Sequence, residues 1–276
     1  MVGTMFHFIM VPPQPVNRPA PEPPRSVFAR HIEVLALIAE AAEPPRFGDL
    51  AAATGHSKAT LHRILAALQE EGLVRPDPRG GWRPGLRLVH FASRAWFGLD
   101  LPQAAAEEMA ALRDATGETV RLAVLRGTEM LYLAQLDSPE PVSFRLRVGA
   151  SGPAYCSGTG KAVLAFLDPA QRAALLDAVP LERHTPRTLV DRAALEQDLV
   201  AARAQGFALD DGEQAAEVRS LGAPILDRQG RPQGAISLTV PAFRRDRAAL
   251  LALAPLLVAA AGRIAARLPP GFRAEV

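Results

Sequence analysis

The hydrophobic residues of the first third of the chain recur at helical spacing in three successive segments. The first segment begins after Ser26, a residue suited to cap a helix, and stops at Pro44-Pro45. A short second helix is expected at about residues 48–54, and a longer third helix at residues 57–71. The third helix carries its apolar residues on one side: Leu61, Ile64, Leu65 and Leu68. Because the short Gly55-His56 turn joins the last two helices, the pattern predicts a helix-turn-helix.

The third helix turns a polar face away from its apolar side. The outward positions carry hydroxyls, bases and an imidazole: Ser57, Lys58, Thr60, His62 and Arg63. Such groups bind phosphate oxygens and base edges, and the second helix of a helix-turn-helix presents its early residues to the major groove. These residues are therefore the candidate base-reading set. An ordinary helical hairpin with a polar outer face would show the same pattern, so that alternative stays open.

A basic hairpin follows the third helix directly. Two short strand-like pieces, residues 73–75 and 82–83, flank the turn-forming residues 76–81. Pro84 cannot donate to a strand ladder, so we expect it at a strand end or edge. A hairpin in this place is a wing that can lie along the DNA backbone, and its bases are the candidate phosphate contacts: Arg75, Arg79 and Arg83. Residues 86–98 are then predicted to form an amphipathic linker helix.

The charge distribution favours a nucleic-acid partner for this half. Residues 1–98 carry 11 Lys and Arg against 8 Asp and Glu, a net charge of +3, whereas residues 99–276 carry 20 against 21, a net charge of −1. The excess of positive charge is larger within residues 55–94, which carry seven Lys and Arg against three Asp and Glu. A local excess of positive charge attracts a polyanion, although a solvated helix face can carry such an excess by chance.

The rest of the chain mixes helical and strand-like patterns. Helices are expected at residues 102–116 and 192–205, and a long helix closes the chain. Alternating apolar and polar residues predict several strands, at residues 118–125, 130–136, 143–148, 207–210, 220–226 and 234–240. A glycine-rich loop at residues 149–160 opens a further helix through Phe166. Hairpins flanked by helices indicate an α+β domain around an antiparallel sheet.

Two further segments complete the expected domain organisation. Residues 1–25 hold seven prolines between Pro12 and Pro24 and are predicted to be a disordered tail without a secretory signal. The apolar run at residues 248–262 is shorter than the about 20 residues of a membrane helix and is interpreted as buried. The expected domains are the tail, a winged helix-turn-helix domain at residues 26–85, a linker helix at residues 86–100 and a second domain at residues 101–270.

No sequence feature indicates catalysis or a resident metal. Ser157-Gly158-Thr159-Gly160-Lys161 is similar to a phosphate-binding P-loop, but Tyr155 and Ala162 stand where that motif needs glycine and Ser or Thr. Cys156 is the single cysteine, which excludes an intramolecular disulfide, fits a reducing cytoplasm and is interpreted as a small buried hydrophobe rather than a nucleophile. Apart from one weak pair, His56 and His62, the six histidines show no metal-ligand spacing. We therefore expect no catalytic residue, metal or cofactor.

The helix-turn-helix segment carries a recognisable motif. The run from Asp49 to Val74, and most specifically Lys58-x-Thr60-x-His62-Arg63, resembles the DNA-binding domain of the IclR family of bacterial transcriptional regulators. The family usually has Leu-Pro where this chain has His56-Ser57, so the start of the third helix departs from the family pattern. The resemblance implies a homodimer, or a dimer of dimers, on a double-stranded DNA operator with half-sites about one helical turn, ~34 Å, apart.

The second half carries four further marks, at residues 148–162, 185–188, 206–213 and 218–224, and resembles the effector-binding domain of the same family. The resemblance thus extends from Ser26 to about Leu268. It implies a GAF-like α+β domain with a small-molecule site, whose residues by position are Gly158, Thr159, Asp210, Ser220, Ser237 and Thr239. Many relatives have cysteine where this chain has Ser220, and serine where it has Thr239, so the chemistry of the site departs from theirs.

The chemistry of this set suits a carboxylate ligand. A loop at a helix N-terminus offers backbone N–H groups and a positive dipole end, and alternation places Ser237 and Thr239 on one face of a strand. The alternative is that these small residues only let helix and sheet pack closely. Pro153-Ala154-Tyr155-Cys156 and Val218-Arg219-Ser220 resemble most closely the family branch that regulates aromatic-acid breakdown through the β-ketoadipate route.

The sequence therefore predicts a cytoplasmic, sequence-specific DNA-binding transcriptional regulator whose operator binding is modulated by a carboxylate or aromatic acid. Repression and activation use the same parts, so both are consistent with the sequence. Two other functions stay open. One is an enzyme that acts on a small acid in the second domain, and the other is a winged-helix module for protein contacts.

Overall fold

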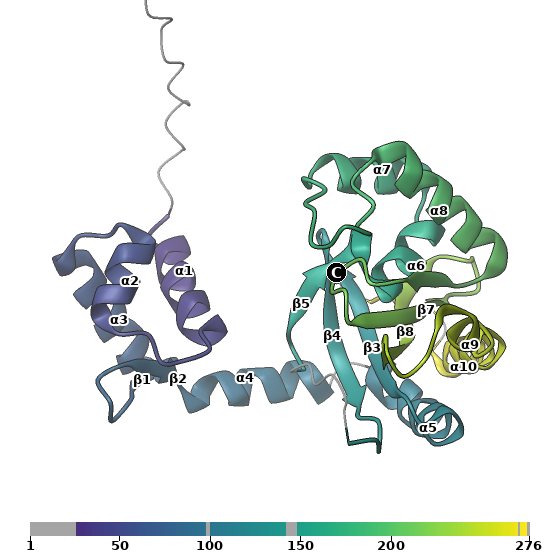
Figure 1. The fold of residues 1–276 in the computed structure, drawn as a ribbon. Helices are drawn as coiled ribbons and strands as arrows, with labels where there is room; N and C mark the ends of the chain where they lie inside the picture. Colours follow the sequence, from purple (N-terminus) through teal and green to yellow (C-terminus); the bar gives the residue numbers. More distant parts are fainter. Residues whose placement is uncertain (1–25, 98–99, 142–147, 270, 275–276) are drawn as a thin grey trace, which may run out of the picture. The chain divides into compact units, whose positions relative to one another are not determined.

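A computed structural model describes residues 26–97, 100–141, 148–269 and 271–274 (Figure 1). The chain divides into two compact units, with the boundary between Trp96 and Phe97, and each unit is described by itself. The tail predicted at residues 1–25 lies outside the described residues, as does almost all of the strand predicted at residues 143–148.

The first unit consists of three helices, a two-stranded wing and a fourth helix. Its elements are α1 (Val27–Glu40), α2 (Phe47–Thr54), α3 (Lys58–Glu70), β1 (Val74–Pro76), β2 (Trp82–Pro84) and α4 (Leu86–Phe97). Both predicted N-caps are confirmed, because the Ser26 hydroxyl accepts the N–H of Ala29 and the Ser57 hydroxyl accepts the N–H of Thr60. Gly55 ends α2 at a φ of 66°, which a side chain would strain.

The apolar sides of α1, α2 and α3 enclose one core. Its buried members are Val34, Ile38, Leu50, Leu61, Ile64, Leu65, Leu68 and Val74. The predicted inner side of the third helix is confirmed, since its four residues are at most 3% exposed. The wing is antiparallel, and Pro84 pairs with Val74 at the strand end, as its missing N–H requires. A bridge between Arg46 and Gly81 attaches the segment before α2 to the wing.

The second unit is built on a six-stranded antiparallel sheet in the order β5-β4-β3-β8-β7-β6. The strands are β3 (Thr119–Arg126), β4 (Glu129–Leu136), β5 (Ser151–Pro153), β6 (Ala208–Asp210), β7 (Val218–Leu226) and β8 (Pro232–Pro241). The two predicted hairpins, β3–β4 and β7–β8, are confirmed. The sheet places β3 beside β8, so residues far apart in the chain lie side by side.

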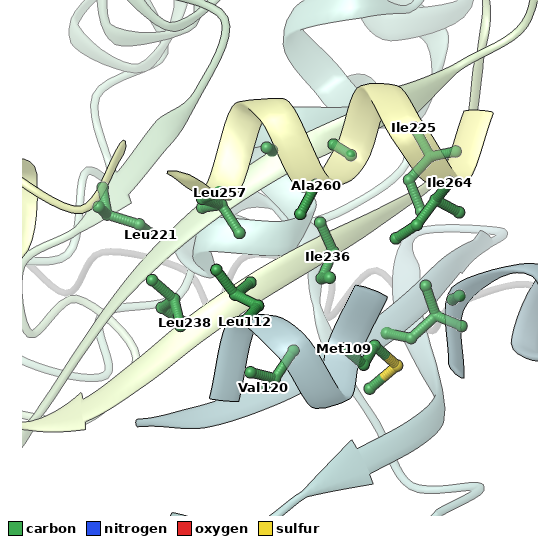
Figure 2. Close-up of a cluster of buried hydrophobic side chains, with 14 of the residues drawn as sticks. Met109, Leu112, Val120, Leu221, Ile225, Ile236, Leu238, Leu257, Ala260 and Ile264 are labelled. Atoms are coloured by element: carbon green, nitrogen blue, oxygen red, sulfur yellow. The ribbon is translucent and has the colours of Figure 1, made fainter. Parts of the chain in front are cut away.

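Helices cover both faces of this sheet (Figure 1). They are α5 (Asp100–Thr116), α6 (Gly158–Phe166), α7 (Pro169–Asp177), α8 (Arg192–Gln205), α9 (Arg247–Leu251) and α10 (Ala254–Arg267). One face packs against α5, α9 and α10, and Figure 2 shows its core, in which Met109 and Leu112 meet Ile236, Leu257 and Ile264. The other face packs against α6, with α7 and α8 behind it. We call this second face the α6 face.

Three local predictions need correction. The helix α7 was not expected from the sequence, because it is short and a single buried residue, Leu176, gives no helical period. The expected glycine-rich loop at residues 149–160 instead contains β5, a 3₁₀ turn (Ala154–Cys156) and the first turn of α6. The long terminal helix is interrupted after α9, and Pro255 lies in the first turn of α10, where its missing N–H costs nothing.

Within the described part of the chain, one stretch, Arg247–Arg267, has the length and hydropathy of a membrane-spanning helix. Leu250, Leu257 and Ile264 on this stretch are fully buried against the sheet and α5. One side of the stretch is therefore buried in the second unit, although only 33% of its apolar window is buried.

Candidate nucleic-acid interface and ligand site

The early residues of α3 form an exposed polar surface on the first unit. Ser57, Lys58, His62 and Arg63 are exposed and Thr60 is half-buried, whereas Leu61 among them is fully buried. The predicted outward set therefore lies together on the side of α3 opposite the core. Positively charged and hydrogen-bonding side chains on one accessible helix face can contact phosphates and base edges.

The members of this set are held in different ways. The Ser57 hydroxyl donates to Thr60 Oγ1 at 2.9 Å while it accepts the Thr60 N–H, so this pair starts the helix. His62 stacks on Phe47 of α2, with ring centroids 4.3 Å apart. Lys58 and Arg63 project from successive turns. The geometry thus gives Ser57 a structural role and makes Lys58 and Arg63 the more adaptable contacts.

An acid inside the wing contacts two of its three arginines. Asp77 is buried in the turn, accepts the N–H of Arg79 at 2.9 Å and pairs with the guanidinium of Arg83. The bond from Arg83 holds the pKa of Asp77 below its ordinary value. Arg75 and Arg79 are exposed, whereas Arg83 shares its charge with Asp77. The sequence predicted Asp77 as part of the turn at residues 76–81, but its pairing with Arg83 could not be predicted from the turn signal alone.

Two rows of mostly polar residues cross the α6 face of the sheet, each running from strand to strand. We call each row a rung. The first rung joins residues paired in register on four neighbouring strands: Asp210 on β6, Ser220 on β7, Thr239 on β8 and Thr119 on β3. The second rung joins Gly222 on β7, Ser237 on β8, Arg121 on β3 and Gln135 on β4. The structure thus brings together Asp210, Ser220, Ser237 and Thr239, all predicted from the sequence. It adds Thr119, Arg121 and Gln135, which strand alternation alone could have placed on this face.

The N-terminus of α6 lies directly over these rungs. The Gly158 N–H donates to Ser220 Oγ at 3.3 Å, so that donor is already used within the protein. A Cβ at position 158 would stand 2.7 Å from Ser220 Oγ. Close packing of helix on sheet, the alternative left open above, therefore explains the glycine at 158.

Two buried hydroxyls distinguish this region from an ordinary core. Thr159 Oγ1 and Thr239 Oγ1 are buried, and neither has a hydrogen-bond partner among the described residues. A buried polar atom without a partner costs about 1–3 kcal/mol, so native proteins seldom keep one without a purpose. One hydroxyl lies on the first turn of α6 and the other on the first rung. A ligand atom or an ordered water molecule at this face would satisfy each of them.

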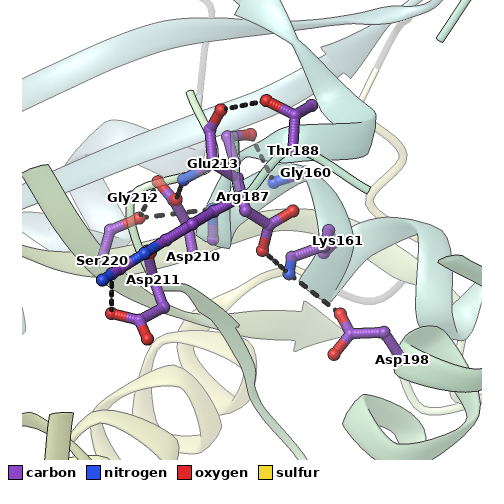
Figure 3. A network of polar contacts seen from close by, with 12 residues as sticks. Gly160, Lys161, Arg187, Thr188, Asp198, Asp210, Asp211, Gly212, Glu213 and Ser220 are labelled. Atoms are coloured by element: carbon purple, nitrogen blue, oxygen red, sulfur yellow. Dashed lines mark hydrogen bonds and ion pairs between the residues drawn. The ribbon is translucent and has the colours of Figure 1, made fainter. Parts of the chain in front are cut away.

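A charged network lies beside the rungs (Figure 3). Lys161 is only 1% exposed, and its ammonium lies 2.9 Å from Asp198 and also bonds the carboxylate of Glu213. The hydroxyl of Thr188 donates to the Glu213 carbonyl oxygen at 2.7 Å, and that of Thr185 to the Gly212 carbonyl at the same distance. The two threonines thus fix the acidic turn, a role that the sequence motif did not disclose.

Burial governs the acid–base properties of this region. Desolvation raises the pKa of Asp210 to about 6, against the opposing effects of the Glu213 N–H, Lys161 and the Ser220 hydroxyl. Desolvation likewise raises the pKa of Glu213 to about 7, although Lys161 works against the shift. Both carboxyls are therefore easier to protonate than ordinary surface acids.

In the glycine-rich segment, the side chains and glycines that could suggest catalysis have structural roles. Burial raises the pKa of the Cys156 thiol to about 12, so the thiol stays protonated at neutral pH and is a poor nucleophile. Ser157 caps α6 by accepting the Gly160 N–H at 3.1 Å. A Cβ at position 160 would stand 2.1 Å from the Ala154 carbonyl oxygen. The glycines of this P-loop-like segment are therefore explained by the close packing of the α6 N-terminus against neighbouring backbone.

Comparisons with protein families match nearly the whole described chain. The family model described as the IclR helix-turn-helix domain matches residues 28–78. The model described as the bacterial transcriptional regulator IclR C-terminal domain matches residues 94–266. The first match contains α3 and the start of the wing, and the second contains both polar rungs.

Individual relatives agree with these matches. The HTH-type transcriptional regulator BhcR of Paracoccus denitrificans is 31% identical over 242 residues, which cover 87% of this chain and 86% of that protein. XynR of Escherichia coli, another HTH-type transcriptional regulator, is 32% identical over 80% of this chain and 88% of its own. A crystal structure of an IclR homolog from Microbacterium hydrocarbonoxydans, complexed with 4-hydroxybenzoate, is 28% identical with a TM-score of 0.76 and covers 88% of this chain and 99% of its own.

Proposed function

We propose that this chain, which belongs to the IclR family of bacterial transcriptional regulators, is a cytoplasmic, sequence-specific DNA-binding regulator whose operator binding responds to a small organic acid. The observation that carries the proposal is the exposed polar face of α3, which lies opposite a fully buried apolar side. This is the arrangement that presents a recognition helix to a major groove.

The DNA contacts divide into two kinds. Lys58, Thr60, His62 and Arg63 are proposed to reach base edges, with Ser57 at the helix cap beside the backbone. The wing supplies phosphate contacts through Arg75, Arg79 and Arg83, and the last of these is braced by Asp77. Phosphate contacts add affinity on every sequence, whereas base contacts select the operator.

A homodimer is proposed from the surface of α4. Leu86 and Val89, three residues apart on one side of this helix, are 80% and 63% exposed. An amphipathic helix with an exposed apolar stripe is stabilised when a second copy covers that stripe. Two copies would present two recognition helices to half-sites about 34 Å apart.

The small-molecule site is proposed at the α6 face of the second unit. Among the described residues, the buried hydroxyls of Thr159 and Thr239 have no hydrogen-bond partner there, and Asp210, Ser220 and Ser237 lie on the same two rungs. Gly158 is part of the site through its backbone and its close packing. The structural relative that holds 4-hydroxybenzoate supports an aromatic acid as the first ligand to test.

Selection of bound genomic fragments by the full chain tests the regulator proposal. We expect a limited set of fragments that share a two-fold symmetric site, with an affinity that falls steeply as salt rises. Addition of 4-hydroxybenzoate should then change the affinity for the selected fragment. Binding that neither selects fragments nor depends on salt would instead favour a winged-helix module for protein contacts. Turnover of the acid would favour the enzyme alternative.

A further inference from the structure

Arg121 is a guanidinium buried on the α6 face of the sheet. It lies in the middle of β3, is 9% exposed and pairs in register with Ser237 on β8. Its neighbours Val120 and Leu122 belong to the opposite core, so strand alternation turns Arg121 toward α6. Burial lowers the pKa of Arg121, but an arginine keeps its proton in proteins. A permanent positive charge therefore lies beside the proposed ligand residues.

The neighbours of Arg121 hold its guanidinium in a fixed orientation. Its Nε donates to Gln135 Oε1 at 2.9 Å, and Gln135 Nε2 donates in turn to Asp137 at 2.6 Å. The guanidinium carbon lies 5.7 Å from the ring centroid of Tyr132. These contacts fix the plane of the guanidinium and keep its positive charge on the α6 face of the sheet, where it attracts a carboxylate.

Arg121 and Asp210 lie toward opposite ends of the two rungs on the α6 face. Their strands, β3 and β6, are separated in the sheet by β8 and β7. The charge of Asp210 is among the groups that oppose the lowering of the Arg121 pKa by burial. Between them lie the hydroxyls of Ser220, Ser237 and Thr239 on the two rungs. The region is thus polar at both ends, with a cation at one end and a hydrogen-bonded carboxyl at the other.

We infer that Arg121 determines the specificity of the ligand site by pairing with the carboxylate of a small hydroxy acid. The hydroxyl of the acid then reaches the Ser220 and Asp210 end of the first rung. This inference rests on the proposed ligand-binding function of the second unit and names the charge that selects the ligand. The Thr159 and Thr239 hydroxyls, which have no partner within the described residues, supply further hydrogen bonds along the bound molecule.

Calorimetry on the full chain with matched neutral and charged ligands tests the inference. The first pair is 4-hydroxybenzoate and 4-hydroxybenzamide, which differ only at the carboxyl group. We expect the wild type to bind the acid at least 10-fold more tightly than the amide. Arg121→Gln should weaken binding of the acid about 10- to 100-fold and leave binding of the amide within about threefold, because only the charge-assisted bonds are lost.

Two further variants complete the design. Arg231→Gln removes an exposed arginine that pairs with Asp227 in the β7–β8 turn of the same unit, and it should leave both affinities unchanged. Arg121→Lys keeps the charge but not the planar fork, so it should weaken binding of the acid less than Arg121→Gln does. If circular dichroism shows that Arg121→Gln does not fold, Arg121→Lys carries the test. A purely structural Arg121 would change the melting temperature of both variants without changing the ratio of acid to amide affinity.

The outcomes separate the inference from the proposed function. Equal binding of acid and amide by the wild type, or an unchanged acid-to-amide ratio in a folded Arg121 variant, overturns the role of Arg121 and leaves the ligand site standing. Absence of heat with 4-hydroxybenzoate, protocatechuate, β-ketoadipate, muconate and their amides overturns both the inference and the ligand half of the proposed function. The DNA-binding half is decided separately by the salt dependence of fragment binding.

Discussion

Gly222 on β7 lies so close to Gly158 on α6 that a Cβ at position 222 would stand 2.1 Å from the Gly158 carbonyl oxygen. Helix and sheet therefore touch backbone to backbone at this point. The contact fixes the distance between the N-terminus of α6 and the two polar rungs of the sheet. It follows that the glycine pair positions the proposed ligand site without contacting a ligand through a side chain.

Replacement of Gly222 by alanine should destabilise the second unit. Because backbone atoms block the methyl group, α6 must move, and overpacking of this kind costs about 1–3 kcal/mol of the free energy of unfolding. Urea unfolding of the full chain measures the change. Gly262→Ala on α10 is the matched control, since a Cβ there meets nothing within 4 Å, and it should be neutral or slightly stabilising. Equal stability of the two variants would show that α6 is not held at this contact.

Loss of the Lys161 charge should also destabilise this unit. Lys161→Met removes the cation from between Glu213 and Asp198, and breaking a buried pair from one side costs about 3–5 kcal/mol. Lys161→Met combined with Glu213→Leu removes the charge left behind and should recover much of the loss. Denaturant unfolding compares the two variants. A double variant as unstable as the sum of its single changes would argue against this ion pair.

The raised pKa of Asp210 predicts that the free energy of unfolding decreases as the pH rises. Between about pH 4 and pH 6 the unfolded chain has released this proton while the folded chain still holds it, so folding binds a proton. Stability from this group is therefore largest at the acidic end and falls as pH rises through about 6, by on the order of 1.4 kcal/mol per pH unit. The neutral variant Asp210→Asn should remove that slope. Thermal unfolding of the wild type and of Asp210→Asn from pH 4 to pH 7 measures this difference. If stability depended on pH in the same way in the two proteins, the prediction would be contradicted.

Substitutions in the DNA-binding unit should separate specificity from affinity. Arg63→Ala on α3 should reduce discrimination between the selected operator and a scrambled site by about 1–3 kcal/mol. Arg75→Ala in the wing should weaken both sites alike and lower the salt slope by about one. Fluorescence anisotropy at several salt concentrations measures both effects. Arg228→Ala, an exposed arginine in the β7–β8 turn, serves as the control. Unchanged affinity and specificity in Arg63→Ala would show that α3 is not the recognition helix.

A charge on the exposed stripe of α4 should break the proposed dimer. Val89→Lys places an ammonium where the partner's apolar surface would pack, so we expect a shift toward monomer in light scattering and a loss of affinity for two-half-site DNA. Phe243→Lys changes an equally exposed apolar residue after β8 and should leave the oligomeric state unchanged. A dimer that survives Val89→Lys but not Phe243→Lys would move the interface away from α4.

Local periodicity accounts for what could be predicted. The spacing of Leu61, Ile64 and Leu68 predicted α3 and its outer face, because a helix beside a single core buries one side. Alternation of apolar and polar residues predicted the β3–β4 and β7–β8 hairpins, because successive side chains of a strand point to opposite faces of the sheet. The short helix α7 lacks such a period, and Asp168 and Pro169 at its start were the signals that could have found it.

The helix-turn-helix, the wing and the polar face of α3 could all be predicted from the order of residues, since these features depend on residues close together in the chain. The sequence also placed Ser220, Ser237 and Thr239 in one set, through family resemblance. The three-dimensional structure was needed to place Arg121 beside Ser237 and to show that Thr159 and Thr239 are buried with no partner in the described chain. The physical reason is register: strand pairing between distant segments, and the height at which a helix packs on the sheet, are fixed by the whole core rather than by any local pattern.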